Sequence, residues 1–190
     1  MVQMSERVNR PISTSELERR WKAIRTAMDE QDIDVLLMQN NNDHMGGYTK
    51  YFTDIPATNG YPVTIVFPSD DGMTQINQGP FDMVKNLDMN GSDGVHRGVK
   101  TMMTTPSYAC ASYTRKYDPI LTCKALEPYK HATIGLVGTY QMSFALVDYI
   151  KKQFPDATYV EASDLVDKIK VIKSDEELDL IRGTARQQVA

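Results

Sequence analysis

The stretch D-K-I-K-V-I-K-S-D-E-E-L-D-L-I-R, residues 167–182, decides how the C-terminal part of this 190-residue sequence folds. Ser174 precedes three acidic residues, and the last of them, Glu177, lies three positions after the serine. This is the spacing of a capping box, in which the serine hydroxyl accepts a backbone N–H and the glutamate reaches back to the serine backbone. Acidic side chains in a first turn also suit the positive end of the helix dipole. The stretch therefore predicts a helix that begins at Ser174.

An apolar stripe runs along this predicted helix, formed by Leu178, Ile181, Ala185 and Val189 at helical spacing. Such a stripe needs a partner surface to cover it. We expect the helix to bury less of its stripe than it would in a longer protein. It should therefore fray, or pack Leu178 and Ile181 against a neighbouring chain.

The segment I-K-V-I-K-S-D-E-E-L-D-L-I-R, residues 169–182, resembles a junction in the creatinase/prolidase family of metallopeptidases, which includes the Xaa-Pro peptidases. There the pattern R-x-I-K-S-x-E-E-(I/L)-x-x-(I/M)-R joins the N-terminal domain to the catalytic "pita-bread" domain. The alternative explanation is an ordinary capped amphipathic helix. The resemblance implies a ribonuclease-H-like α/β fold, with a mixed sheet flanked by helices.

Composition and charge restrict the classes of function. The sequence has 21 basic and 25 acidic residues, which argues against a nucleic-acid partner. The longest apolar runs are too short to span a membrane, and the first residues form no apolar signal region. Cys110 and Cys123 are then expected to be reduced thiols. These features predict a cytoplasmic protein with neither nucleic acid nor membrane as a partner.

The first half of the sequence alternates helix and strand patterns. Ser13 and Glu16 have the spacing of a second capping box. Val35–Met38 is an unbroken apolar run, typical of a central strand buried on both faces. The turn signal Ser69-Asp-Asp-Gly72 predicts a hairpin. The predicted elements of this half are a helix over residues 14–31 and strands at 35–38, 63–67 and 73–77.

In the second half, the apolar spacing at Phe81–Met89 predicts a short helix, and Val99–Met103 predicts an edge strand. Asp118-Pro119 has the pattern of an N-cap followed by proline, which predicts a helix start. Tyr140 and Phe144 begin the apolar stripe of a later helix. The remaining predicted elements are strands at 132–137 and 157–160 and a helix at 164–170 capped by Ser163, while residues 107–117 give no clear assignment.

A mixed sheet with helices on its faces accommodates this order of elements, and residues 132–160 should form a parallel strand–helix–strand crossover. We expect a flexible N-terminus over residues 1–12 and a creatinase/prolidase-like N-terminal domain over 13–170. Residues 171–190 would be the junction and the first helix leading to a catalytic domain.

The sequence shows no catalytic motif and no metal-binding motif. His44, His96 and His131 lie far apart, and neither H-E-x-x-H nor C-x-x-C occurs. We therefore predict no catalytic residue, no metal ligand and no cofactor in this chain. The resemblance implies that two divalent metals, Mn, Co or Zn, would be bound by two Asp, one His and two Glu of the catalytic domain.

The polar loop that follows the first strand is the candidate region for substrate access. Its Y-T-K-Y-F-T-D segment resembles the family's N-I-R-Y-L-T-G, with Tyr48 in place of Asn and Asp54 in place of Gly. In creatinase an arginine precedes the proline that opens the second strand. This arginine reaches into the active site of the partner subunit and holds the substrate carboxylate there. Tyr61 stands there in this sequence and brings no positive charge, which counts against creatine. The candidates for substrate access are Tyr61, His44 and Tyr48; the alternative is a loop whose aromatic residues only pack against the core.

We therefore expect the non-catalytic N-terminal domain of a hydrolase that cleaves a small amide or an Xaa-Pro peptide bond. The resemblance implies that such a domain packs on its own C-terminal catalytic domain, helps to form a homodimer and narrows access for a small substrate. One alternative is a stand-alone peptide- or protein-binding module of the same fold. A second is a ribonuclease-H-like nuclease, for which Asp34, Asp43 and Asp54 would have to cluster around magnesium.

Overall fold

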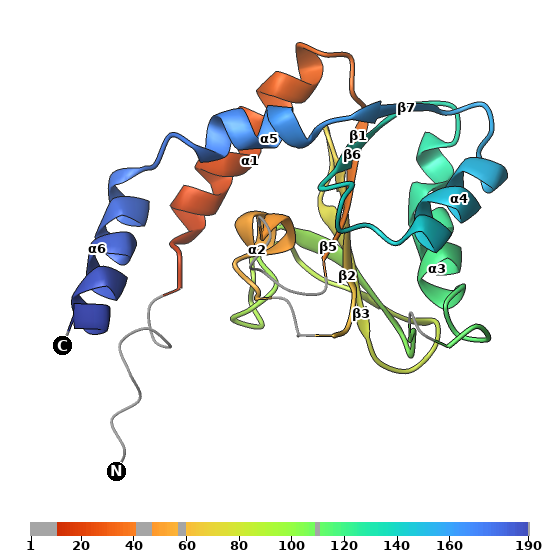
Figure 1. Cartoon of the computed structure of the whole chain (residues 1–190), viewed down its shortest axis with the longest axis horizontal. Coiled ribbons are helices and arrows are strands. Elements are labelled where there is room, and N and C mark those ends of the chain that lie inside the picture. The colour runs from red at the N-terminus through yellow and green to blue at the C-terminus, as the bar shows by residue number, and fades with distance from the viewer. Residues whose placement is uncertain (1–10, 41–46, 57–59, 109–110, 190) are drawn as a thin grey trace.

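The computed structural model describes residues 11–40, 47–56, 60–108 and 111–189, and these build one seven-stranded mixed sheet covered by helices (Figure 1). The strand order is β4-β5-β3-β2-β1-β6-β7. The strands are β1 (Val35–Asn40), β2 (Val63–Pro68), β3 (Met73–Gln78), β4 (Met83–Asn86), β5 (Val99–Thr105), β6 (Thr133–Val137) and β7 (Thr158–Glu161). The helices are α1 (Thr14–Asp29), α2 (Tyr48–Thr53), α3 (Tyr117–Leu126), the short η2 (Glu127–Tyr129), α4 (Phe144–Gln153), α5 (Ser163–Lys170) and α6 (Asp175–Val189).

Strand β1 lies in the middle of the sheet, as its apolar run predicts. All six of its residues are buried, and it pairs antiparallel with β2 and parallel with β6. The hairpin between β2 and β3 and the parallel pairing of β6 with β7 also confirm the sequence prediction. These pairings place the most apolar strands in the centre of the sheet, where both of their faces are covered.

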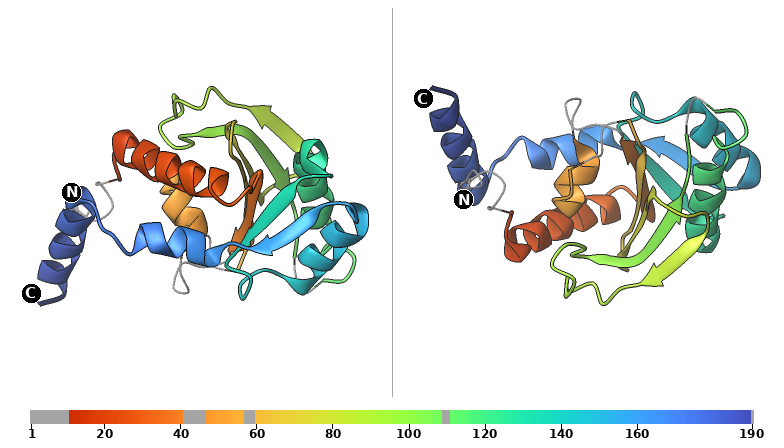
Figure 2. Two further views of the ribbon diagram at one scale, coloured as in Figure 1. Left: turned by 90° about the horizontal axis from the view of Figure 1, so that it is seen from above. Right: turned by 90° about the horizontal axis from the view of Figure 1, so that it is seen from below.

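The core has two layers, one on each face of the sheet. Because side chains alternate along a strand, Leu36 and Met38 face the layer beneath α1, α2 and α5. Val35 and Leu37 face the layer beneath α3 and α4. Figures 1 and 2 show these two groups of helices on opposite sides of the sheet. In the described part of the chain, no helix is long and apolar enough to cross a membrane.

The helix predicted over Phe81–Met89 is wrong. Residues 83–86 form strand β4, which pairs antiparallel with β5 and lies at the edge of the sheet, so that β5 is not the edge strand. Asp82 and Met89 have φ angles of 54° and 62°, and these left-handed residues bracket the strand. A short apolar spacing fits a helix or a strand, and pairing with β5 decides between them.

Two predicted helix starts are also displaced. Helix α4 begins only at Phe144, and Tyr140 and Phe144 are 57% and 83% exposed, because the buried face of α4 is formed by Leu146 and Ile150. Helix α3 begins at Tyr117, so Asp118 lies inside its first turn and is not its N-cap. In both cases a two-residue pattern does not specify the first residue of the helix, because the neighbouring residues can start it earlier or later.

Candidate functional site

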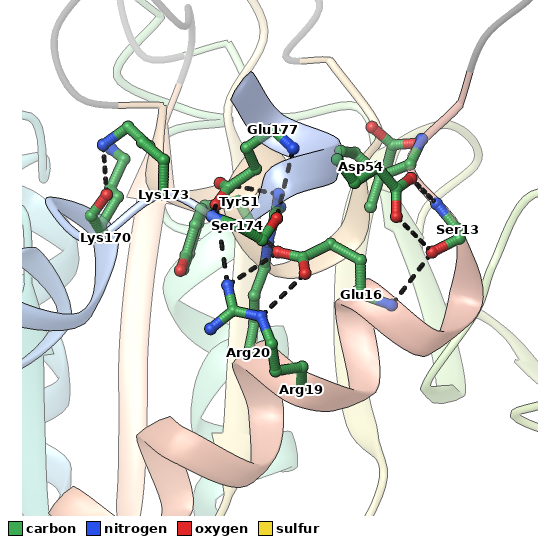
Figure 3. Close-up of polar contacts among 12 residues, drawn as sticks. Ser13, Glu16, Arg19, Arg20, Tyr51, Asp54, Lys170, Lys173, Ser174 and Glu177 are labelled. Carbon is green, nitrogen blue, oxygen red and sulfur yellow. Dashed lines mark hydrogen bonds and ion pairs between the residues drawn. The ribbon is translucent and has the colours of Figure 1, made fainter. Parts of the chain in front are cut away.

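Figure 3 shows a cluster of polar contacts at the junction between the sheet domain and helix α6. The Ser174 N–H donates to Glu177 Oε2 at 2.9 Å, and the Glu177 N–H donates to Ser174 Oγ at 3.2 Å. These two reciprocal bonds form the predicted capping box. They fix the first turn of α6 and the side chain of Glu177 at the same time.

The capping box predicted for α1 forms only in part. The Glu16 N–H donates to Ser13 Oγ at 3.1 Å, but the Glu16 carboxylate turns to Arg19 and Arg20. Glu176 of α6 takes its place, accepting from the Ser13 N–H at 2.7 Å and from Ser13 Oγ at 2.6 Å. A glutamate from the last helix therefore completes the N-terminal cap of the first.

Arg20 joins three helices at this junction. Its side chain is 5% exposed, and its guanidinium donates to Glu16 Oε1 and to Glu177 Oε1, both at 2.9 Å. It also donates to the Tyr51 carbonyl at 3.1 Å and lies 4.4 Å from the centroid of the Tyr51 ring. Arg20 thus connects α1, α2 and α6 through hydrogen bonds that satisfy a buried charge.

A second arginine also pairs with the carboxylates of this cluster. Arg19 donates two bonds of 2.8 Å to the Glu16 carboxylate and lies 3.6 Å from Glu177 Oε2. Burial alone would raise the pKa of Glu16, but the hydrogen bonds and charges of Arg19 and Arg20 outweigh it and lower the pKa to about 2. The carboxylate is therefore ionised at neutral pH and paired from two sides.

Asp54 holds the end of α2 to the segment before α1. Its φ of 60° is left-handed, a conformation that aspartate tolerates better than most side chains. Its Oδ2 accepts from the Ile12 N–H at 2.9 Å and from Arg97 Nη2 at 2.8 Å. The side chain at this position thus forms long-range contacts within the chain that a glycine does not provide.

A groove of about 410 Å³ lies between α2 and the start of α6. Its walls include Lys50, Tyr51, Lys173, Leu180 and Ile181. Leu180 packs on the core, whereas Ile181 is 51% exposed. Helix α6 extends away from the sheet (Figures 1 and 2). The cluster around Arg20 therefore holds the first turn of α6 in place, whereas the later turns expose an apolar face to solvent.

Comparison with known proteins identifies the fold. No protein-family model matches the sequence, and no curated protein matches it. An Xaa-Pro dipeptidase from Bacillus anthracis matches with a TM-score of 0.58 and 16% identity, over 86% of this chain and 38% of its own. Dipeptidase PepE from Mycobacterium ulcerans matches with a TM-score of 0.57 and 16% identity, over 90% of this chain and 40% of its own.

A shorter chain, an Xaa-Pro aminopeptidase from Streptococcus pyogenes, matches with a TM-score of 0.53 and 15% identity, over 82% of this chain and 98% of its own. This chain has the fold of the N-terminal domains of prolidase and aminopeptidase P. The predicted fold, a mixed sheet flanked by helices, is confirmed. The chain spans 38% and 40% of the length of the two dipeptidases.

Within this prolidase-type fold, the access candidates lie in separate places. The half-buried Tyr61 packs edge-on against Tyr108, with ring centroids 5.9 Å apart, just before β2. Tyr48 is 2% exposed and donates to Asp167 Oδ2 of α5 at 3.0 Å. Burial, with the Asp167 hydrogen bond, raises the pKa of Tyr48. His44 falls outside the described residues.

The acidic residues considered for a nuclease do not form one group in the described part of the chain. Asp34 accepts from the Thr133 N–H at 2.7 Å, Asp54 is bound to Arg97, and Asp43 lies outside the described residues. His96 contacts Asp93 at 2.6 Å on the surface. Among the residues described, no group of three or more His, Cys, Asp or Glu side chains is placed to hold a metal.

The residue that sequence reasoning missed is Arg20, although a signal for it exists. Leu17, Ile24 and Met28 define the buried face of α1, and Arg20 lies on that same face at helical spacing. A charged residue inside an apolar stripe indicates a buried ion pair. Its partner Glu177 is 157 positions away and is brought near only by the fold.

Proposed function

We propose that this chain is the non-catalytic N-terminal domain of a hydrolase of the creatinase/prolidase family, which cleaves an Xaa-Pro peptide bond or another small amide. Three observations support this: the fold, the junction motif at residues 169–182, and the share of each dipeptidase that the chain spans, 38% and 40%. A fourth observation carries the proposal: helix α6 is held at Glu176 and Glu177 but exposes Ile181. We expect the C-terminal catalytic domain to cover that exposed face.

The role of the Arg20 cluster in this proposal is to set the direction of α6. Glu176 binds Ser13 and Glu177 binds Arg20, so the first turn of α6 is attached to α1 at two points. A helix fixed at its start transmits that orientation along its length. The catalytic domain would then be held at a defined angle to the sheet domain, and the two would pack as one unit.

The family's two divalent metals, Mn, Co or Zn, have no fitting donor set among the residues that the structure describes. Asp34 and Asp54 are engaged with Thr133 and Arg97, and the surface His96 contacts Asp93. We therefore assign any metal site to the catalytic domain and derive no chemical step in this chain.

The proposal extends to a cytoplasmic homodimer in which Tyr61 lines the entrance to the partner subunit's active site. Tyr61 offers a hydroxyl and an aromatic face but no positive charge, which favours a peptide or another amide over creatine. His44 and the buried Tyr48 are weaker candidates for the same role. The test is the activity of Tyr61→Phe, Tyr48→Phe and His44→Ala in the full-length enzyme. A change of kcat/KM by less than about twofold in all three, well under 1 kcal/mol of transition-state binding, would show that these side chains are structural.

The proposed function itself is tested by comparing this 190-residue chain with the protein encoded by the whole gene. We expect the longer protein to hydrolyse an Xaa-Pro dipeptide with Mn²⁺ and the 190-residue chain to hydrolyse neither that dipeptide nor creatine. Metal analysis should find no stoichiometric ion in the 190-residue chain. One tightly bound divalent ion per chain, or hydrolysis by this chain alone, would contradict the proposal.

A stand-alone peptide- or protein-binding module is the second candidate, because the groove beside α6 combines apolar and basic walls. It would be favoured if the gene encoded no catalytic domain and the chain still bound peptides. Substituting Ile181→Asp would then abolish peptide binding, whereas in the hydrolase it would weaken the contact between domains.

A further inference from the structure

A cavity of about 210 Å³ lies on the face of the sheet that α3 and α4 cover, away from the Arg20 cluster. It is found where β1 ends, where β2 begins and where α3 and α4 have their N-termini. The polar side chains of its wall belong to Gln39, Ser107, Arg115, Asp118, Gln141 and Ser143. In α/β proteins, the loops beyond the carboxyl ends of strands are the common place for a ligand.

Among the polar groups of this wall, the buried carboxyl group of Asp118 lacks a cation to pair with it in the described part of the chain. It is 5% exposed, and among the described residues no lysine, arginine or histidine lies within ion-pair distance of it. Burial raises the pKa of Asp118 to about 6, against the effect of a hydrogen bond from Ser107. Buried carboxylates are normally paired with a cation, because their desolvation is costly. An ammonium group in the cavity would supply that cation.

A structural role explains Asp118 less well. An aspartate in the first turn of α3 interacts favourably with the helix dipole, but that interaction is available to an exposed side chain. It does not require burial beside a cavity. The buried position is accounted for when a ligand replaces the water that the carboxylate has lost.

The same cavity carries positive groups at other points of its wall. Arg115 is exposed, and in the described part of the chain no carboxylate pairs with it. Ser143 is the N-cap of α4, and its side chain makes no capping hydrogen bond. The first N–H groups of a helix have no partner inside it and attract a carboxylate. Arg115 and the start of α4 therefore form a positive pole within the cavity that Asp118 makes negative.

The size of the cavity limits the ligand. A cavity of about 150 Å³ accepts benzene, so this one accepts a molecule somewhat larger than benzene. Gln39 is already oriented, because its Nε2 donates to Thr64 Oγ1 at 3.0 Å and its Oε1 accepts from the Ser143 N–H at 3.4 Å. Leu146 and two prolines, Pro62 and Pro119, supply the apolar part of the wall. A small molecule with an ammonium, a carboxylate and a short apolar body fits these features.

We propose that this cavity binds a small free α-amino acid as its zwitterion, with the ammonium group on Asp118 and the carboxylate on Arg115 and the N-terminus of α4. The side chain of the amino acid lies against Leu146, Pro62 and Pro119. This site is independent of the proposed catalytic domain, because every group in it belongs to this chain.

The test is titration of the chain with glycine, L-alanine and L-proline, followed by isothermal calorimetry and by ligand-induced change in melting temperature. L-prolinamide lacks the carboxylate and N-acetyl-L-proline lacks the ammonium, so both should bind at least tenfold more weakly than L-proline. Asp118→Asn and Arg115→Gln should each weaken binding at least tenfold. The matched controls are Asp156→Asn and Arg186→Gln, which change exposed residues outside the cavity and should leave binding unchanged.

Three outcomes would overturn the proposal. The first is that none of the three amino acids binds the wild-type chain at millimolar concentration in either measurement. The second is that L-prolinamide or N-acetyl-L-proline binds as tightly as L-proline, which would mean that the cavity recognises only one of the two charged groups of the amino acid. The third is that Asp118→Asn binds L-proline as well as the wild type while remaining folded by circular dichroism. None of these outcomes bears on whether a catalytic domain follows.

Discussion

Glu16 and Asp118 are both only 5% exposed, although the carboxyl group of Asp118 lies deeper in the protein, and their carboxyl groups behave in opposite ways. Burial tends to raise the pKa of both. Glu16 meets Arg19 and Arg20, which lower its pKa to about 2. Asp118 is buried with a hydrogen bond from Ser107 and no cation among the described residues, and its pKa rises to about 6. Burial sets the cost of a charge, and the partner decides whether the charge is kept.

The comparison separates two kinds of region in one fold. Around Arg20, the carboxylates of Glu16 and Glu177 both have charged partners, so the charges of this region are paired and hold the first turn of α6 in place. Around Asp118 the described residues leave a carboxylate and an arginine beside a cavity. Paired buried charges favour stability, whereas an unpaired one beside a cavity favours a ligand.

The largest expected effect comes from removing Arg20, the centre of the paired charges. Arg20→Leu leaves the buried Glu16 and Glu177 with only the half-exposed Arg19 as a shared cation among the described residues, and we expect it to lower the free energy of unfolding by about 3–5 kcal/mol. Urea denaturation measures the loss, and amide hydrogen exchange in the first turn of α6 should become faster.

The matched variant for this prediction is Arg19→Leu. The Arg19 side chain is 43% exposed, and Arg20 still pairs both glutamates when it is removed. Pairs of this exposure contribute little, so we expect a loss of up to about 1 kcal/mol. Equal losses in the two variants would show that the network does not depend on Arg20.

The next effect has the opposite sign. Asp118→Asn removes a buried carboxylate that lacks a cation, and we expect it to raise the free energy of unfolding at pH 7 by about 1–3 kcal/mol, since one pKa unit corresponds to about 1.4 kcal/mol. The gain will be smaller if the amide loses the Ser107 hydrogen bond. The measurement is urea denaturation without added ligand, with Asp156→Asn as the exposed control. A loss of stability would mean that the carboxylate is satisfied in the folded chain.

The pH dependence of stability should show both carboxylates. The ordinary pKa of Asp118 is 3.8 and its folded value is about 6, so between these values the folded state keeps a proton that the unfolded chain has lost. Stability from this group therefore falls as pH rises from about 4 to 6 and is constant above that window.

Glu16 acts in the opposite direction, since its pKa falls from 4.5 to about 2 on folding. Its contribution is complete above about pH 4.5 and is lost as pH falls toward 2. The advantage of Asp118→Asn over the wild type should thus grow between pH 4 and 6, and the disadvantage of Glu16→Gln should grow between pH 2 and 4.5. A difference that does not change with pH would show that the carboxyl group concerned titrates normally.

The sequence predicts local features of both regions well and their long-range contacts poorly. The Ser174 capping box and the buried run at Val35–Met38 are specified by neighbouring residues, and both form as predicted. The same spacing predicts a capping box at Ser13, but Glu16 binds Arg19 and Arg20 instead. Glu176, 163 positions from Ser13, replaces it. Spacing identifies a possible bond, and the fold decides which competing partner takes it.

The same limit applies to the cavity and to strand β4. The proline after Asp118 predicts an N-cap at that residue, whereas its burial depends on how α3 packs on the sheet. The apolar spacing at Phe81–Met89 fits a helix or a strand, and only the position of β5 settles it. Arg20 is the instructive exception, because a charge within the apolar stripe of α1 is visible in the sequence.

The smallest expected effects compare the two N-caps that belong to these regions. Ser13 accepts from the Glu16 N–H and binds both oxygens of Glu176, so Ser13→Ala removes a cap and one bond to α6. We expect it to cost about 1–2 kcal/mol, within the range for lost caps. Ser143 makes no capping bond with its side chain, so Ser143→Ala should change stability by no more than about 0.5 kcal/mol, as a substitution outside such features does. Urea denaturation of both variants in the same buffer gives the difference. Equal costs would show either that Ser143 caps α4 in solution or that Glu176 contributes nothing to the mounting of α6, and hydrogen exchange at α6 distinguishes the two, because only loss of the Glu176 contact should accelerate exchange there.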